Sequence, residues 1–153
     1  MNGVLSLDDI RLSGKRVLYR VDINSPLHPE TGAFLDDGRL RAIIPTISAL
    51  ADAKVVILGH QSRPGRSDFT DLSGHVDRLA RILGRPVRFV PDVCGEVAIE
   101  AIRGMSNGEI VCLDNVRMHT EEMSLKKAGL EELRLSQIVS ELAPEFDAYV
   151  TDA

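Results

Sequence analysis

Short apolar runs alternate along the chain with longer amphipathic segments. The short runs are rich in Val, Ile, Leu or Tyr, and their lengths suit strands rather than helices. In residues 55–58 both alternating faces are apolar, which is typical of an interior strand of a parallel sheet. We therefore predict five strands, over residues 16–22, 54–59, 87–90, 109–114 and 147–151.

Apolar residues recur at helical spacing in most of the intervals between these strands. The first stripe follows Asp37, an expected N-cap, and contains Pro45, which should kink the helix or delay its start. The second ends at Gly84, the third near 107–108, and the fourth at Pro144. The stripes consist of Ile43, Ile44, Ile47 and Leu50; Val76, Leu79, Ala80 and Leu83; Val97, Ala98, Ile102 and Met105; and Leu135, Ile138, Val139 and Leu142.

The alternation of strand and helix predicts right-handed βαβ units. The expected fold class is α/β, a three-layer Rossmann-like domain with a parallel sheet and helices on both faces. A length of 153 residues favours one domain with a core of ordinary size. Two connections, 23–37 and 61–71, are longer than usual and leave the same predicted edge of the sheet, which favours a functional role.

Composition narrows the classes of partner. A formal net charge of -5 argues against a general nucleic-acid binder, although it leaves room for a local basic pocket. We find no apolar run long enough for a membrane span and no secretory leader. Cys94 and Cys112 are too few for a disulfide framework and match no zinc spacing. We therefore expect a cytoplasmic protein with reduced thiols and with neither nucleic acid nor membrane as a partner.

Polar side chains follow three of the predicted strands, at the edge where open α/β sheets bind ligands. Arginine guanidinium groups recognise anions, and amide and hydroxyl groups can support them. We therefore expect one polar crevice that binds an anion, with metal ligands absent. Its candidate residues are Arg20, Asp22 and Asn24 after the first strand, His60, Gln61, Ser62 and Arg63 after the second, and Asn115 and Arg117 after the fourth.

Two of the candidate arginines have a plainer interpretation. Arg39 stands at the start of the first predicted helix, where free N–H groups attract anions, but it could equally be a surface residue paired with Asp36 or Asp37. Arg20 could supply positive charge to the crevice, or it could make a structural contact with Asp22. The sequence pattern leaves both pairs of alternatives open.

The histidines divide in the same way. His60 lies among polar neighbours at a strand end, which favours a functional role over a structural or merely exposed one. His28, His75 and His119 lack such neighbours, and we expect them on the surface. The chain has no P-loop, no Gly-x-Gly-x-x-Gly after the first strand, no nucleophile elbow and no metal-ligand spacing. Anion recognition is the chemistry that remains.

Four segments, taken together and in order, resemble the phosphoglycerate kinase family. They are residues 15–24 (KRVLYRVDIN), 36–41 (DDGRLR), 60–64 (HQSRP) and 114–117 (DNVR). Each alone is weak, but their order and spacing make the combination specific. The HQSRP form resembles the archaeal branch.

The resemblance implies a glycolytic enzyme of two domains. The N-terminal domain binds 3-phosphoglycerate or 1,3-bisphosphoglycerate, the C-terminal domain binds Mg²⁺ with ATP or ADP, and closure of the hinge brings them together. Residues 1–153 would be a truncated N-terminal domain that ends before the nucleotide domain, its expected partner. Alone it is expected to be inactive and to hold no cofactor.

The resemblance also assigns roles. Arg39 would be catalytic, neutralising charge on the phosphoryl group in transfer, and Asp22 and Asn24 would contact the glycerate end or position its neighbours. The remaining substrate-binding candidates are Arg20, His60, Gln61, Ser62, Arg63 and Arg117. The alternative is a stand-alone anion-binding or interaction module with a flavodoxin-like fold.

Overall fold

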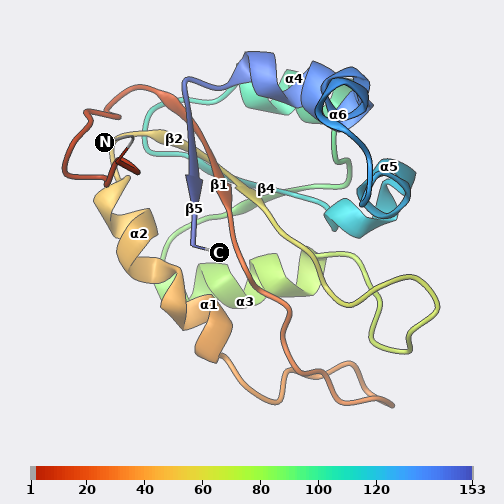
Figure 1. Cartoon of the computed structure of the whole chain (residues 1–153). Coiled ribbons are helices and arrows are strands. Elements are labelled where there is room, and N and C mark those ends of the chain that lie inside the picture. Colours follow the sequence, from red (N-terminus) through yellow and green to blue (C-terminus); the bar gives the residue numbers. More distant parts are fainter. Residues whose placement is uncertain (1–2, 153) are drawn as a thin grey trace.

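A parallel sheet of five strands runs through the middle of the protein, in the order β3-β4-β2-β1-β5 (Figure 1). The computed structural model describes residues 3–152; Met1, Asn2 and Ala153, which belong to the expected domain range 1–153, lie outside the described residues. All five predicted strands are confirmed, although each begins later or ends earlier than expected. They are β1 (Arg16–Arg20), β2 (Lys54–Leu58), β3 (Arg88–Val90), β4 (Ile110–Leu113) and β5 (Ala148–Thr151).

Helices cover both faces of the sheet, which confirms the three-layer α/β prediction. Figure 1 shows α1, α2 and α3 on one side of the strands and α4 and α6 on the other. In the part of the chain that the structure describes, no helix is both long and apolar enough to cross a membrane. The helices are α1 (Gly38–Ala42), α2 (Ile44–Ala49), α3 (Ser73–Leu83), α4 (Glu96–Arg103), α5 (Thr120–Ser124) and α6 (Leu130–Leu135), with the short turns η1 (Val116–Met118), η2 (Ile138–Leu142) and η3 (Ala143–Glu145).

Side chains of the central strands alternate between two apolar cores. Val55 and Ile57 of β2 pack in the core that contains α1, α2 and α3, whereas Val56 and Leu58 pack in the core that contains α4 and η2. All four side chains are at most 3% exposed. The strand is therefore apolar on both faces because both faces are covered.

The connections change face where the chain reverses direction across the sheet. The chain moves from β1 to β2 and then to β3 through α1, α2 and α3, and it returns to β4 and β5 through α4 and η2. Right-handed crossovers require this change of face. As a result, the connections that leave the neighbouring strands β2 and β4 run to opposite faces, and the carboxyl ends of these strands form the switch point at which open α/β sheets bind ligands.

The first predicted helix is interrupted, as Pro45 indicated. Helix α1 ends before Ile43, and α2 starts at Ile44 with Pro45 in its first turn, where the missing N–H has no partner to lose. Asp37 occupies the N-cap position but makes no capping hydrogen bond there. Its carboxylate instead accepts hydrogen bonds from Arg78 of α3. The two helices that cover this face are thus joined by an ion pair.

The other helical stripes differ from the structure in detail. Gly84 ends α3 in the left-handed conformation, as predicted. The prediction of one helix through the fourth stripe is wrong, because the chain is extended at Ser136, between α6 and η2. Leu135 is consequently 84% exposed, whereas Leu142 is buried. In the third stripe, Val97 is exposed although the rest of the stripe is buried.

Gly59, directly after β2, should tolerate no side chain. A Cβ atom there would lie 2.9 Å from Ile23 and 3.3 Å from Val21, both buried. We expect Gly59→Ala to lower the free energy of unfolding by about 1–3 kcal/mol. Gly74→Ala in α3 is the matched control, because its Cβ would meet only Phe34, at 3.7 Å. The control should be neutral or slightly stabilising, and urea denaturation measures both. Equal effects of the two changes would contradict this account.

Candidate anion-binding site

Three loops meet at the carboxyl edge of the sheet, after β1, β2 and β4. The strands are in register there, with Arg20 opposite Leu58. Beyond the strands, the N–H of Val116 donates to the carbonyl of Gly59 at 3.0 Å, which ties the loop after β4 to the loop after β2. The loops that carry candidate residues from separate strands therefore lie at one edge of the sheet.

Arg39 contacts the loop after β1. Its guanidinium donates to the Asp22 carboxylate, and both side chains are about half exposed. The alternative partners do not hold it: Asp36 accepts from the N–H of Gly38, and Asp37 pairs with Arg78. Arg39 thus lies beside the end of β1 with its guanidinium open to solvent.

Arg20 pairs with Glu122 and not with Asp22, the structural partner that the sequence suggested. Its Nη2 atom donates to Glu122 Oε1 of α5 at 2.9 Å, and no hydrogen bond joins it to Asp22 among the contacts of the described residues. The acidic partner comes from a position 102 residues further along the chain. The pair brings α5 to the edge of the site and offsets part of its positive charge.

Ser62 connects all three loops. Its N–H donates to Asn24 Oδ1 at 2.8 Å, its hydroxyl donates to Asp68 at 2.5 Å, and its carbonyl accepts from Arg117 Nη1 at 2.6 Å. Its φ of 57° lies in the left-handed region, which costs a residue other than glycine on the order of 1 kcal/mol. The three hydrogen bonds hold this conformation, so Ser62 serves as the junction of the site.

A hollow of about 660 Å³ opens beside Ser62. Three guanidinium groups line it, those of Arg63, Arg66 and Arg117, together with Asn24 and Asp68. Arg117 Nε is buried and has no hydrogen-bond partner within residues 3–152. An unsatisfied buried N–H is unfavourable, and an anionic oxygen would satisfy it. This hollow is the position that the structure offers to an anion.

Arg66 was missed by the sequence reasoning. It lies in a turn in which its N–H donates to the carbonyl of Arg63 at 3.2 Å. The sequence did contain a signal for it: Arg66 follows Arg63 by three positions, across a turn that contains Pro64 and Gly65. Arg66 adds the third positive charge at the mouth of the hollow.

His60 lies between the charged groups of the site. Burial lowers its pKa; the positive charges of Arg117 and Arg20 lower it further, and the carboxylates of Asp22 and Glu122 oppose them. The ring is therefore neutral at pH 7 and can donate one N–H. An anion bound nearby would raise the pKa of His60 again.

Gln61 and His75 are placed differently from what we expected. Gln61 is 0% exposed, and its amide is hydrogen bonded to Ser25 and His75, so it faces away from the hollow. His75, expected on the surface, is 2% exposed, and that prediction is wrong. The available signal was its position four residues before the buried Leu79, on the same face of α3.

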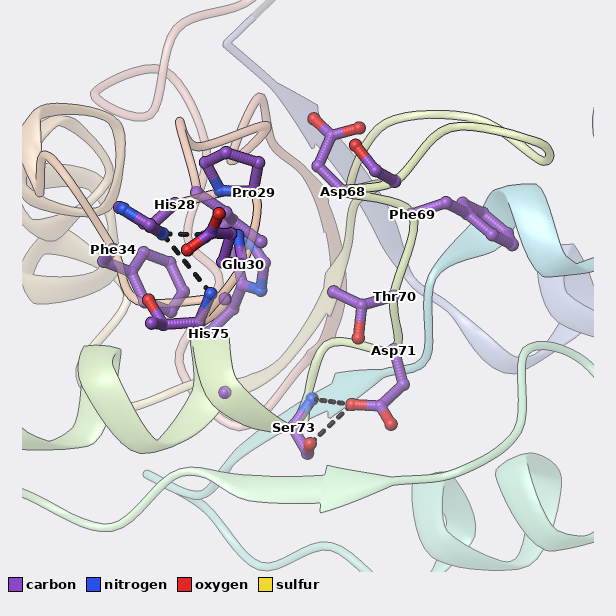
Figure 2. Close-up of a pocket in the computed structure, with 15 residues that line it drawn as sticks. His28, Pro29, Glu30, Phe34, Asp68, Phe69, Thr70, Asp71, Ser73 and His75 are labelled. Carbon is purple, nitrogen blue, oxygen red and sulfur yellow. Dashed lines mark hydrogen bonds between the residues drawn. The ribbon is translucent and has the colours of Figure 1, made fainter.

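A second hollow of about 490 Å³ lies next to the first, between residues 27–34 and 67–75 (Figure 2). Its charged lining groups include the carboxylates of Glu30, Asp68 and Asp71, and no arginine lines it. His28 Nδ1 accepts from the backbone N–H groups of Glu30 and Thr31. The two hollows share Asp68 but differ in charge, so the electrostatic field directs an anion to the arginine side.

Other chemistries find little support in the described residues. No group of three or more His, Cys, Asp or Glu side chains within 3–152 could hold a metal ion. Burial raises the pKa of Cys94 to about 11 and that of Cys112 to about 12. Both thiols are buried and free, which makes them poor nucleophiles.

Comparison with known families agrees with this geometry. A sequence model described as phosphoglycerate kinase matches residues 7–153. The chain belongs to the phosphoglycerate kinase family. The resemblance seen in the four motifs is thus confirmed, and the relatives found are mostly archaeal.

The phosphoglycerate kinases that it matches are much longer than this chain. The phosphoglycerate kinase of Methanothermobacter thermautotrophicus is 47% identical over 97% of the chain but only 36% of the relative, and that of Archaeoglobus fulgidus is 42% identical over 100% and 37%. The crystal structure of phosphoglycerate kinase from Pyrococcus horikoshii superimposes with a TM-score of 0.91 at 35% identity, covering 98% of this chain and 36% of that one. The chain therefore spans little more than a third of the length of these relatives.

The buried His75 should make the fold sensitive to acid. Burial lowers its pKa to about 4, against 6.5 in an unfolded chain, with Asp71 and the backbone of Ile23 opposing. Below pH 6.5 the unfolded chain takes up the proton first, so this contribution to stability is complete above pH 6.5 and declines toward pH 4. We expect protonation of the unfolded chain at this histidine to lower the free energy of unfolding by about 1.5 kcal/mol between pH 6.5 and pH 5. Urea denaturation across this range measures the loss, and His75→Asn should have a shallower slope. An unchanged slope would count against the assignment.

Proposed function

We propose that this chain is the N-terminal, substrate-binding domain of a phosphoglycerate kinase, and that it binds 3-phosphoglycerate and 1,3-bisphosphoglycerate in the arginine-lined hollow. The observation that carries the proposal is the convergence of Arg63, Arg66 and Arg117 on one hollow at the carboxyl edge of the sheet. The buried, unpartnered Nε of Arg117 supports it. As a whole, the longer enzyme would transfer a phosphoryl group between 1,3-bisphosphoglycerate and ADP in cytoplasmic glycolysis or gluconeogenesis.

The ligand carries a phosphate at one end and a carboxyl group at the other, and the site offers two kinds of partner. The guanidinium groups around the hollow suit the phosphate, because their planar N–H pairs match its oxygens. Asn24, which points its amide toward Ser62, and Asp22 beside it would face the hydroxyl and carboxyl end. His60 and Arg20 would complete the positive lining.

Arg39 is proposed as the catalytic residue. Phosphoryl transfer depends mainly on positioning and on stabilising the charge that develops. Among the described residues Arg39 is held by Asp22 alone, and it is half exposed, so it can turn toward a phosphoryl group at the open side of the site. Arg39 does not line the hollow, and a catalytic role would explain why it lies beside the site.

Mg²⁺ with ATP or ADP is assigned to the remainder of the longer protein. The side chains of residues 3–152 do not form a group that could hold a metal ion. When bound, the metal would neutralise the nucleotide phosphates. Closure of that second domain over the hollow would exclude water, so the chain alone should bind substrate without turnover.

Binding can be tested on the chain itself. We expect 3-phosphoglycerate to bind at low salt with a millimolar or lower Kd and to weaken as salt is added, because the ion pairs are exposed. Arg117→Ala should weaken binding at least tenfold, whereas Arg103→Ala should have no effect, because Arg103 lies on α4 and pairs with Glu145 of η3. Amide chemical shifts report both results. A folded chain that does not respond would contradict the proposal, and equal affinity for inorganic phosphate would favour the alternative of a simple anion-binding module.

The role assigned to Arg39 can be tested in a longer protein that contains the nucleotide domain. We expect Arg39→Ala to lower kcat by about 10²–10³, as loss of a transition-state contact does. Its stability should change little, since an exposed ion pair contributes about 0–1 kcal/mol. Arg41→Ala is the control, because Arg41 is also exposed on α1 but faces Asp37. Near-normal turnover of the Arg39 variant would remove it from the catalytic role.

A further inference from the structure

A network of buried amides lies directly behind the site. Gln61 Oε1 accepts from the N–H of Ser25 at 2.9 Å, and Gln61 Nε2 donates to the Ser25 carbonyl at 3.0 Å. The side chain thus pairs with one residue of the neighbouring loop through two hydrogen bonds, as a strand would. Because the amide is fully buried, this pairing fixes the loop after β1 against the loop after β2.

His75 extends the network into α3. Since the Ser25 N–H donates to Gln61 Oε1, this atom is an acceptor, and His75 Nε2 at 2.9 Å must carry the donated proton. The ring of Phe34 packs edge-on against the His75 ring at 4.8 Å between centroids. The first turn of α3 therefore holds Gln61 in one orientation.

Asn115 extends the network in the other direction. Its Nδ2 donates to the carbonyls of Gln61 and Thr70, both at 2.8 Å, and its Oδ1 accepts from the N–H of Arg117 at 3.1 Å. The Asn115 side chain is 0% exposed. One amide thus links the loop after β4 to both ends of the loop after β2.

Three members of the network lie within two positions of a residue of the proposed site. Ser25 follows Asn24, Gln61 lies between His60 and Ser62, and Asn115 precedes Arg117 by two positions. The network therefore sets the backbone from which the ligand-binding side chains project. Buried amides suit this purpose, because a shift of any loop would leave a buried polar group unpaired.

We propose that Gln61, His75 and Asn115 are positioning residues, which set the spacing of Asn24, Ser62 and Arg117 and thereby the affinity for the phosphorylated three-carbon acid. The proposal rests on the proposed function, since it concerns the same site. It reassigns Gln61, because the amide contributes through Ser25 and not through contact with the ligand.

The test is a double-mutant cycle on 3-phosphoglycerate binding, followed by amide chemical shifts. Gln61→Leu preserves volume but leaves the Ser25 N–H and carbonyl unpaired. We expect it to weaken binding about tenfold in the original chain, but less than threefold when Asn24→Ala is already present, because Gln61 acts through the position of Asn24. Ile102→Val in the opposite core is the control for lost stability; it should leave the affinity unchanged.

The outcomes separate the two proposals. If the unaltered chain does not bind, the proposed function fails. If the chain binds and Gln61→Leu binds equally well, or loses the same factor in both backgrounds, the positioning role is overturned. If Gln61→Leu does not fold, His75→Asn decides, because it keeps Ser25 paired while removing the contact of the ring with Gln61. Weaker binding by that variant supports the role, and unchanged binding overturns it.

Discussion

The reversal of the chain across the sheet is the constraint on which the site depends. Because β2 and β4 are neighbours whose outgoing connections run to opposite faces, a gap between these connections is expected beyond the hydrogen bond that joins Val116 to Gly59. The first core holds α1, α2 and α3 against one face of the sheet, and the second core holds α4 and η2 against the other. The order of the strands therefore sets where the site lies, and the side chains determine which ligand it binds.

Positive charge gathered at this gap must be balanced while no ligand is bound. Three of the arginines at the site have an acceptor: Arg20 has Glu122, Arg39 has Asp22, and Arg117 has the Ser62 carbonyl. These contacts are partly exposed, so a dianion can compete for the guanidinium groups without a large loss of stability. The arrangement also explains how an acidic chain, with net charge -5, can hold a basic hollow.

The sequence predicted the strands and the edge that carries the site, but not the partners of the side chains. Val55 to Leu58 could be recognised because burial on both faces leaves an apolar run, and the polar strand ends followed from it. The Arg20 pair with Glu122 could not, because it joins segments far apart in the chain and follows no period. The break at Ser136 was missed because an extended residue between two helical turns leaves the apolar spacing almost intact. His75 and Gln61 were misplaced for another reason: polar residues are expected outside unless their partners are known.

The burial of Gln61 and His75, which the sequence did not predict, indicates how the site is built. A polar residue inside a small domain is unfavourable unless every group finds a partner, and Gln61 and Asn115 find theirs on three different loops. An apolar residue at either position would fill the same space but would leave the loops free to slide, since apolar contacts are not directional. Directional hydrogen bonds instead favour one arrangement, in which Ser62 keeps its left-handed backbone and Arg117 keeps its place beside Ser62. The buried amides thus convert the gap left by the topology into a site of defined shape.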